Sequence, residues 1–325
     1  MRNEPSPPPT LLDWLLDTAN PSARYLTLRD LMDGGRSDPA AAEARSTIPA
    51  WGPVQRILAA MDPREFWGRF RRPFYGGALS TQATLNLLAE LGLPPNPQIQ
   101  EACEHLIADG QHTNGGFDSD PEEGAAPLCY TGIAVRTLLH FGYAGDPRLD
   151  RAINYLIERA SLRRGLGCQC CADTFCGWGI AKALTAFAAL PAGAKSPERA
   201  EAAQRMANTL LDHGMDFEGR DARWLELGFP LDYQSDLAEL CDALSGLGWC
   251  DPVTDARFAS LLDALLRARS AAGLWAKHFG TRVLQIERRG APSKWITIRA
   301  LRALKRSGRA GTDAVHEILR GEKGE

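Results

Sequence analysis

Apolar residues recur at helical spacing along most of this chain, with almost no strand-like alternation. The leucines within residues 11–16 share one helical face. Asn20 and Pro21 then form a helix cap followed by a first-turn proline, and Gly34 and Gly35 end that second helix. The N-terminal fifty residues are therefore predicted to hold two helices.

A repeated unit follows from about residue 51: an amphipathic helix, a loop rich in Gly, Asp, Arg or Cys, and a second, more apolar helix. Successive units lie roughly 45–60 residues apart, which is typical of helical-hairpin repeats. The second helices are predicted to begin near Thr81, Thr131, Gly177, Asp236 and Trp295. The first helices are centred on Ile57, His105, Tyr155, Met206 and Leu265.

The second helices are too apolar to lie at a surface. Residues 180–190, for example, carry a single lysine. A helix that is apolar most of the way round needs burial on several sides. This favours an all-α fold in which the hairpins close into a barrel, with the second helices inside and the first helices outside. The five loops that precede the inner helices would then open at the same end.

The predicted organisation has four parts along the chain. They are a disordered N-terminus (1–10), an N-terminal helical extension (11–50), a barrel domain of five hairpins (51–306), and a C-terminal helix and tail (307–325).

Composition and charge restrict the setting and the partners. The 325 residues carry a net charge of -3, which argues against a nucleic-acid binder that depends on bulk phosphate attraction. No apolar run approaches the ~20 residues that span a bilayer. The N-terminus has no basic-then-apolar signal, so we expect a cytoplasmic protein. The sequence leaves peripheral membrane contact and the oligomeric state open.

Glycine-aromatic motifs precede two of the inner helices, Gly115-Gly116-Phe117 and Gly273-Leu274-Trp275. With them, residues 51–306 resemble the terpenoid cyclase and protein prenyltransferase α/α-toroid superfamily. Within it the chain looks most like prokaryotic proteins described as prenyltransferase or squalene-oxidase repeat proteins. The resemblance implies an α/α toroid and an apolar, isoprenoid-type small molecule as substrate, with a diphosphate group as one option.

The proton-donating motif of the superfamily's cyclases, Asp-x-Asp-Asp-Thr-Ala, has a weak echo at Asp118-Ser119-Asp120-Pro121 and one closer partial match. It is the segment that ends in Ser235, Asp236, Leu237 and Ala238, in which Asp236 and Ala238 match the motif and Ser235 stands at the donor's place. Asp236 and Ser235 are the catalytic candidates that follow from the resemblance. A serine cannot protonate an alkene, so the usual acid is missing.

Cysteines cluster before the third inner helix. Aligning the repeats places Cys129 and Cys176 at equivalent inner-helix starts, where the helix dipole favours thiolate. In a cytoplasmic protein cysteines are free thiols or metal ligands more often than disulfides, although a reversible disulfide stays an alternative here. Zinc prefers four S or N ligands. The candidate zinc ligands are Cys129, Cys168, Cys170, Cys171 and Cys176. The remaining cysteines Cys103, Cys241 and Cys250 are interpreted as core.

Aromatic and basic residues gather around the predicted helix starts. Aromatic faces could hold a greasy chain or stabilise a cation, and arginines could clamp a diphosphate through bidentate contacts. The candidate substrate-binding residues are Tyr130, Trp178, Trp224, Tyr233, Trp295, Arg71, Arg72 and Arg289.

Three functions stay open at this point. The first is a terpenoid cyclase-like or prenyltransferase-like protein that binds an apolar substrate in the toroid cavity. The second is a zinc-binding toroid with an enzymatic or structural site. The third is a non-catalytic repeat scaffold that binds protein or lipid, because a fold by itself does not imply a function.

Overall fold

The computed structural model describes residues 10–68, 73–74, 80–118, 126–162, 164–168, 175–194, 196–248, 253–270, 272–280 and 286–309. In these residues the backbone forms α-helices and short 3-10 turns, and β-type pairing is limited to isolated bridges. The all-α class predicted from the sequence is confirmed.

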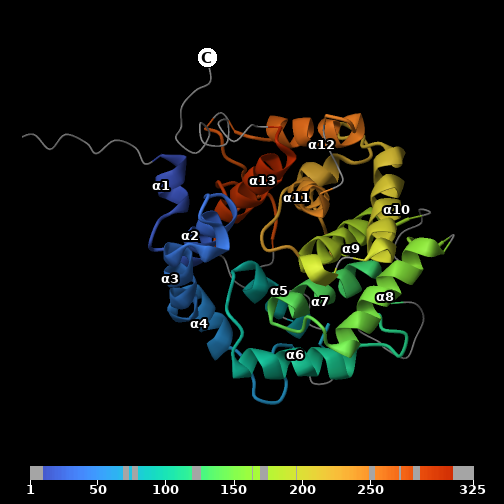
Figure 1. Ribbon diagram of the computed structural model, residues 1–325. Helices are drawn as coiled ribbons and strands as arrows, with labels where there is room; N and C mark the ends of the chain where they lie inside the picture. Colours follow the sequence, from blue (N-terminus) through green and yellow to red (C-terminus); the bar gives the residue numbers. More distant parts are fainter. Residues whose placement is uncertain are drawn as a thin grey trace, which may run out of the picture.

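Inner helices in the described part of the chain form a closed ring (Figure 1). In ring order they are α2 (Pro21–Asp30), α5 (Thr81–Glu90), α7 (Leu128–His140), α9 (Gly177–Ala189), α11 (Leu237–Leu247) and α13 (Lys294–Ser307). Tyr25 of α2 lies against Gly92, directly after α5. Because α13 packs on α2, the last inner helix meets the first and the structure is an α/α toroid.

An outer layer of helices surrounds this ring (Figure 1). It comprises α3 (Pro39–Thr47), α4 (Gly52–Ala59), α6 (Pro97–Gly110), α8 (Pro147–Ser161), α10 (Pro197–His213) and α12 (Ala256–Arg267), with the short α1 (Leu11–Leu15) beside α2. Short 3-10 turns are η1 (Gly35–Ser37), η2 (Ile48–Ala50), η4 (Ala192–Ala194) and η5 (Ala222–Leu225). The five predicted hairpins are confirmed as α4–α5, α6–α7, α8–α9, α10–α11 and α12–α13.

Burial explains why the two layers differ in sequence. In α9 every residue from 179 to 187 is buried, whereas in α8 the buried residues recur every three or four positions and the rest face solvent. Most helices start at a polar side chain that accepts a hydrogen bond from a first-turn backbone N–H. Examples of these caps are Ser80, Asn96, Asp146, Ser196, Asp236 and Ser293.

The inner helices share one orientation. The Nε1 of Trp295, near the start of α13, donates to the Oγ of Ser22, near the start of α2, at 3.3 Å. Gly132, near the start of α7, lies against the backbone of Lys182 in α9. The N-terminal ends of the inner helices therefore lie at one end of the ring, as the sequence predicts, and we call this end the mouth.

Residues 11–50, expected as an extension, contribute α2 to the inner ring and α3 to the outer layer. The guanidinium of Arg302 in α13 donates from Nη1 to Asp30 Oδ2 of α2 at 2.6 Å, and from Nε to Asp242 Oδ1 of α11 at 2.7 Å. Burial would raise the pKa of Asp30, but Arg302 and Arg29 outweigh it and hold that pKa well below its ordinary range. This ion-pair cluster joins both ends of the chain's helical part.

None of the described helices combines the length and the apolarity needed to cross a bilayer.

Candidate functional site

The loop that leads into α11 crosses the mouth of the ring. We call residues 226–236 the crossing loop. Asn86 of α5 donates from Nδ2 to the carbonyl oxygen of Leu231 at 2.9 Å, although α5 and α11 lie opposite each other in the ring. The aromatic ring of Phe229 stacks on Trp295 with 4.4 Å between centroids. The crossing loop therefore packs across the mouth and forms part of its surface.

Asp236 and Ser235, the catalytic candidates from the sequence, lie at the inner end of the crossing loop and are fully buried. The Asp236 carboxylate accepts from the backbone N–H of Glu239 at 2.7 Å and of Gly228 at 2.8 Å. Ser235 donates from Oγ to Glu239 Oε2 at 2.7 Å. Burial raises the pKa of Asp236, and Arg299 opposes that rise. In this structure both side chains cap α11 and anchor the crossing loop.

Three of the predicted aromatic residues come together at the mouth from three different elements. Trp178 at the start of α9 and Tyr233 of the crossing loop lie with ring centroids 6.2 Å apart. Tyr130 at the start of α7 is close enough to interact electrostatically with Tyr233. Tyr233 is 49% exposed, so the group is open to solvent. We call Tyr130, Trp178 and Tyr233 the aromatic cluster.

Neighbours extend the aromatic cluster on both sides. Phe74 lies 5.0 Å from Tyr130 between ring centroids. The guanidinium of Arg223, in η5, lies 5.2 Å from the Trp178 ring centroid and forms no ion pair with other described residues. Sequence reasoning did not single out Arg223, because its position over Trp178 depends on how the loop before α11 folds.

The other two predicted aromatic residues lie in the core. Trp224 is 6% exposed and packs against Gly177, where an added Cβ would approach its ring to 3.1 Å. Trp295 is 4% exposed and packs between Phe229 and Trp51. Both rings therefore belong to the core that packs around the mouth and not to its exposed surface.

A buried ion pair lies one helical turn beneath the aromatic cluster. Lys182 follows Trp178 by four residues in α9, so the two share a helix face. Its Nζ donates to Glu239 Oε2 of α11 at 2.7 Å, and both side chains are almost completely buried. The charges of Lys182, Arg299 and Arg136 outweigh burial and lower the pKa of Glu239. We call the Lys182–Glu239 pair the floor of the site.

Asp232 supplies a titratable group to this site that the sequence analysis missed. It precedes Tyr233 in the crossing loop and is partly buried. Burial raises the pKa of Asp232, while the Lys182 charge and the Tyr233 backbone N–H oppose the rise. The same carboxyl acts on Tyr130 and Cys129, so Asp232 lies beside the start of α7. The sequence does contain a signal that could have identified Asp232, because this acidic residue directly precedes the candidate Tyr233.

The predicted anion clamp is described only in part. Arg71 and Arg72 lie outside the described residues. Arg289 is exposed in the loop before α13 and makes no ion pair with another described side chain. Among described residues, Arg223 is thus the cation placed against the aromatic cluster.

Two of the candidate zinc ligands, Cys129 and Cys168, are electrostatic neighbours, and burial raises the pKa of Cys129 to about 12. The Cys176 Sγ caps α9 by accepting from the Gly179 N–H at 3.4 Å. No three His, Cys, Asp or Glu side chains among the described residues are placed to hold a metal. Cys170 and Cys171, with Cys250, lie outside the described residues.

Two of the cysteines interpreted as core match that prediction. Cys103 and Cys241 are fully buried, and burial raises the pKa of both thiols. Neutral, apolar thiols of this kind fill space between helices.

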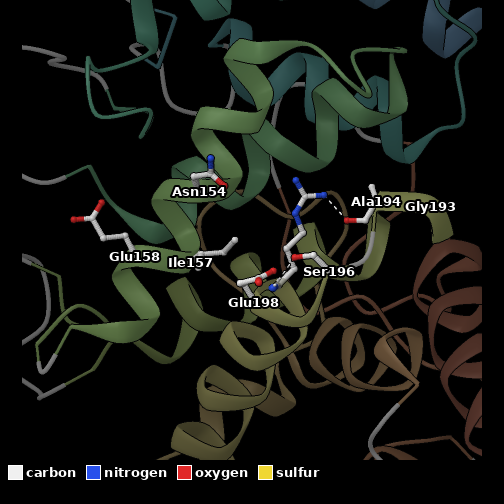
Figure 2. Close-up of a pocket in the computed structure, with 8 residues that line it drawn as sticks. Asn154, Ile157, Glu158, Gly193, Ala194, Ser196 and Glu198 are labelled. Atoms are coloured by element: carbon white, nitrogen blue, oxygen red, sulfur yellow. Dashed lines mark hydrogen bonds between the residues drawn. The ribbon is translucent and has the colours of Figure 1, made fainter.

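A separate pocket of about 610 Å³ lies in the outer layer, between α8 and the start of α10 (Figure 2). Its wall includes Glu158 and Glu198, and its arginine, Arg199, donates to the Ala194 carbonyl oxygen and lies 3.4 Å from Asp150. None of the candidate residues from the sequence lines this pocket, so we place the candidate site at the mouth.

Comparison with known proteins gives similarity in structure only. No known protein family matches the chain, and no curated protein is similar to it. A variant of the type II terpene cyclase MstE from Scytonema, in complex with geranylgeranyl dihydroxybenzoate, is 16% identical with a TM-score of 0.46, covering 84% of this chain and 77% of that chain. An unsaturated glucuronyl hydrolase specific for heparin is 15% identical with a TM-score of 0.46, covering 92% and 86%. At such values the likeness is one of general outline, and no substrate follows from it.

Proposed function

We propose that this chain is a terpenoid cyclase-like protein that binds an isoprenoid or other apolar small molecule at the mouth of the toroid. The observation that carries the proposal is the aromatic cluster, in which rings from α7, α9 and the crossing loop converge and stay open to solvent. Exposed aromatic faces favour apolar groups and cations. Arg223 beside Trp178 adds a positive charge for an acidic head group.

Asp232 is our candidate for proton exchange with the bound molecule, in place of the fully buried Asp236 and Ser235. A carboxyl with a raised pKa keeps its proton to higher pH than an ordinary aspartate does. It is adjacent in sequence to Tyr233 and near Tyr130, so it lies beside the aromatic cluster. Burial of Asp236 and Ser235 supports a capping role for these two side chains.

Isothermal titration calorimetry with geranyl diphosphate tests the binding. We expect Trp178→Ala and Tyr233→Ala each to weaken geranyl diphosphate binding by about tenfold or more, because each substitution removes apolar contact worth roughly 1.5 kcal/mol or more. The matched control is Tyr143→Ala, because Tyr143 follows the opposite, C-terminal end of α7. Binding that is equally affected by all three changes would refute the aromatic cluster as the site.

Proton exchange has its own readout. If Asp232 protonates a bound alkene, the carbocation that forms loses a proton from a neighbouring carbon to the Asp232 carboxylate or to water, so the product formed in heavy water contains deuterium. Asp232→Asn abolishes that incorporation while leaving binding intact. Mass spectrometry of the extracted ligand measures it. Incorporation that persists in Asp232→Asn but is lost in Asp236→Asn would return the acid role to Asp236.

The second candidate function is a non-catalytic scaffold. It is favoured by the crossing loop, whose buried Leu227, Phe229 and Leu231 fill the mouth with protein side chains. Failure of geranyl diphosphate and geraniol to bind, in a protein shown to be folded by circular dichroism, would favour this candidate over the first.

A further inference from the structure

The space beneath the mouth is spanned by the protein itself. The Asn86–Leu231 hydrogen bond of 2.9 Å joins α5 to the crossing loop, which leads into α11 on the opposite side of the ring. Leu231 is 2% exposed and Leu227 is fully buried, so the crossing loop is packed on its inner side. An extended ligand would have to pass this loop to follow the ring axis.

Beyond the crossing loop the inner helices present charges to one another. Arg136 of α7 donates from Nη2 to Asn86 Oδ1 at 2.6 Å and to Glu90 Oε1 at 2.7 Å, both in α5. The Arg299 guanidinium of α13 lies 3.7 Å from Glu90 and 3.7 Å from Asp236. Because α2 lies between α13 and α5 in the ring, the Arg299–Glu90 contact runs along the inner side of α2.

Several polar groups in this interior are unsatisfied hydrogen-bond donors or acceptors. Among the described residues, five buried side-chain atoms on α5, α11 and α13 have no hydrogen-bond partner. They are Gln82 Nε2, Glu90 Oε2, Glu239 Oε1, Thr297 Oγ1 and Arg299 Nη1. Buried polar atoms in native proteins are nearly always satisfied, by protein or by ordered water. An apolar chain can supply no hydrogen bond to them, and its entry would desolvate the charges further.

We infer that the mouth accepts only a short apolar group and that a long prenyl chain does not extend into the ring, whose interior is polar and hydrated. This deepens the proposed function and rests on it. From Trp178 to Lys182 the distance along α9 is one turn, about 6 Å, which accommodates about one or two isoprene units. The aromatic cluster forms the walls, and Lys182 with Glu239 forms the floor.

A chain-length series tests the inference by calorimetry. The ligands are the diphosphates of one, two, three and four isoprene units, so that the head group is constant. Each buried methylene is worth about fourfold in affinity, so a chain that entered an apolar channel would gain at least tenfold for every added unit. We expect the affinity to rise up to two units and then to change less than about threefold. A continued rise to four units would overturn the inference.

A high-resolution crystal structure of the ligand-free protein gives an independent answer. We expect ordered waters within hydrogen-bond distance of Glu90 Oε2, Glu239 Oε1 and Arg299 Nη1. An open apolar channel that continues from the mouth past the crossing loop would overturn the inference. If none of the four diphosphates binds, the proposed function fails. The crystal structure then decides by itself whether the interior of the ring is polar.

Discussion

At the scale of single residues, position in the ring separates candidate chemistry from structural chemistry. Asp232 and Asp236 are four residues apart, yet one lies at the surface of the mouth and the other is enclosed by backbone donors. The same holds for tryptophans, because Trp178 is part of the open aromatic cluster while Trp295 is core. Residue type alone could not distinguish these cases.

The raised pKa of Asp232 predicts a pH-dependent effect of replacing it. The folded chain holds the Asp232 proton to higher pH than the unfolded chain, so ionisation of this carboxyl at neutral pH costs folding free energy. Asp232→Asn should therefore raise the free energy of unfolding at pH 7. Below the ordinary aspartate pKa of 3.8 both states are protonated and the gain should vanish. Urea unfolding at pH 7 and at pH 3.5 measures the difference.

Asp33→Asn is the control for this comparison, because the Asp33 side chain is 84% exposed. It should change stability little at either pH. A gain from Asp232→Asn that stays the same at both values of pH would show that charge on Asp232 is not its source.

At the scale of helices, the sequence predicts the fold well and the site less well. Starts near Thr81, Gly177, Asp236 and Trp295 agree with α5, α9, α11 and α13 to within one residue, because caps and apolar runs are local signals. The crossing loop could not be foreseen in this way. Its path depends on a hydrogen bond between residues 145 positions apart, Asn86 and Leu231.

Close contact between α7 and α9 provides a test at this scale. A Cβ on Gly132 would lie 2.5 Å from the carbonyl carbon and oxygen of Lys182, and backbone atoms cannot move aside as a side chain does. Gly132→Ala should therefore lower the free energy of unfolding by about 1–3 kcal/mol, although alanine favours a helix over glycine by about 1 kcal/mol. Urea unfolding followed by circular dichroism measures it.

Gly193→Ala is the matched control, since an added Cβ there meets nothing within 4 Å. We expect it to be neutral to within about 0.5 kcal/mol. If Gly132→Ala is equally neutral, α7 and α9 can separate without cost and the close packing is not needed for stability.

At the scale of the whole molecule, ring closure involves a segment that the sequence analysis set apart. Residues 11–50 were expected to extend from a barrel of five hairpins, but α2 packs between α13 and α5 as an inner helix. Its charged residues Arg24, Arg29 and Asp30 obscure the apolar pattern that marks the other inner helices. Arg29 pairs with the adjacent Asp30, and Asp30 also accepts from Arg302, which is distant in sequence.

Removing Arg302 tests the closure. Arg302→Met leaves Asp30 and Asp242 without their shared cation in a largely buried place. We expect the free energy of unfolding to fall by about 3 kcal/mol, as for other broken buried pairs. The loss should shrink in acid as Asp30 becomes protonated, because its lowered pKa makes the native carboxylate stabilising only above that pKa. Urea unfolding of the two proteins at pH 7 and in acid measures the loss of stability and its decrease at low pH.

Arg205→Met serves as the control, because Arg205 and Glu201 form an exposed pair within α10. Such a pair contributes about 0.5 kcal/mol or less. Equal losses for the two variants would mean that the Arg302 cluster stabilises the ring no more than a surface ion pair does.

The separation of 272 positions between Asp30 and Arg302 has a consequence for the newly made chain. Until α13 has been translated, α2 has no partner on that side, and the Asp30 carboxylate faces solvent. The early hairpins can pack in order as they emerge, but the circle stays incomplete until the closing helix leaves the exit tunnel. A transcript truncated before that helix should therefore yield an open arc, whose uncovered edge is a target for chaperones and proteases.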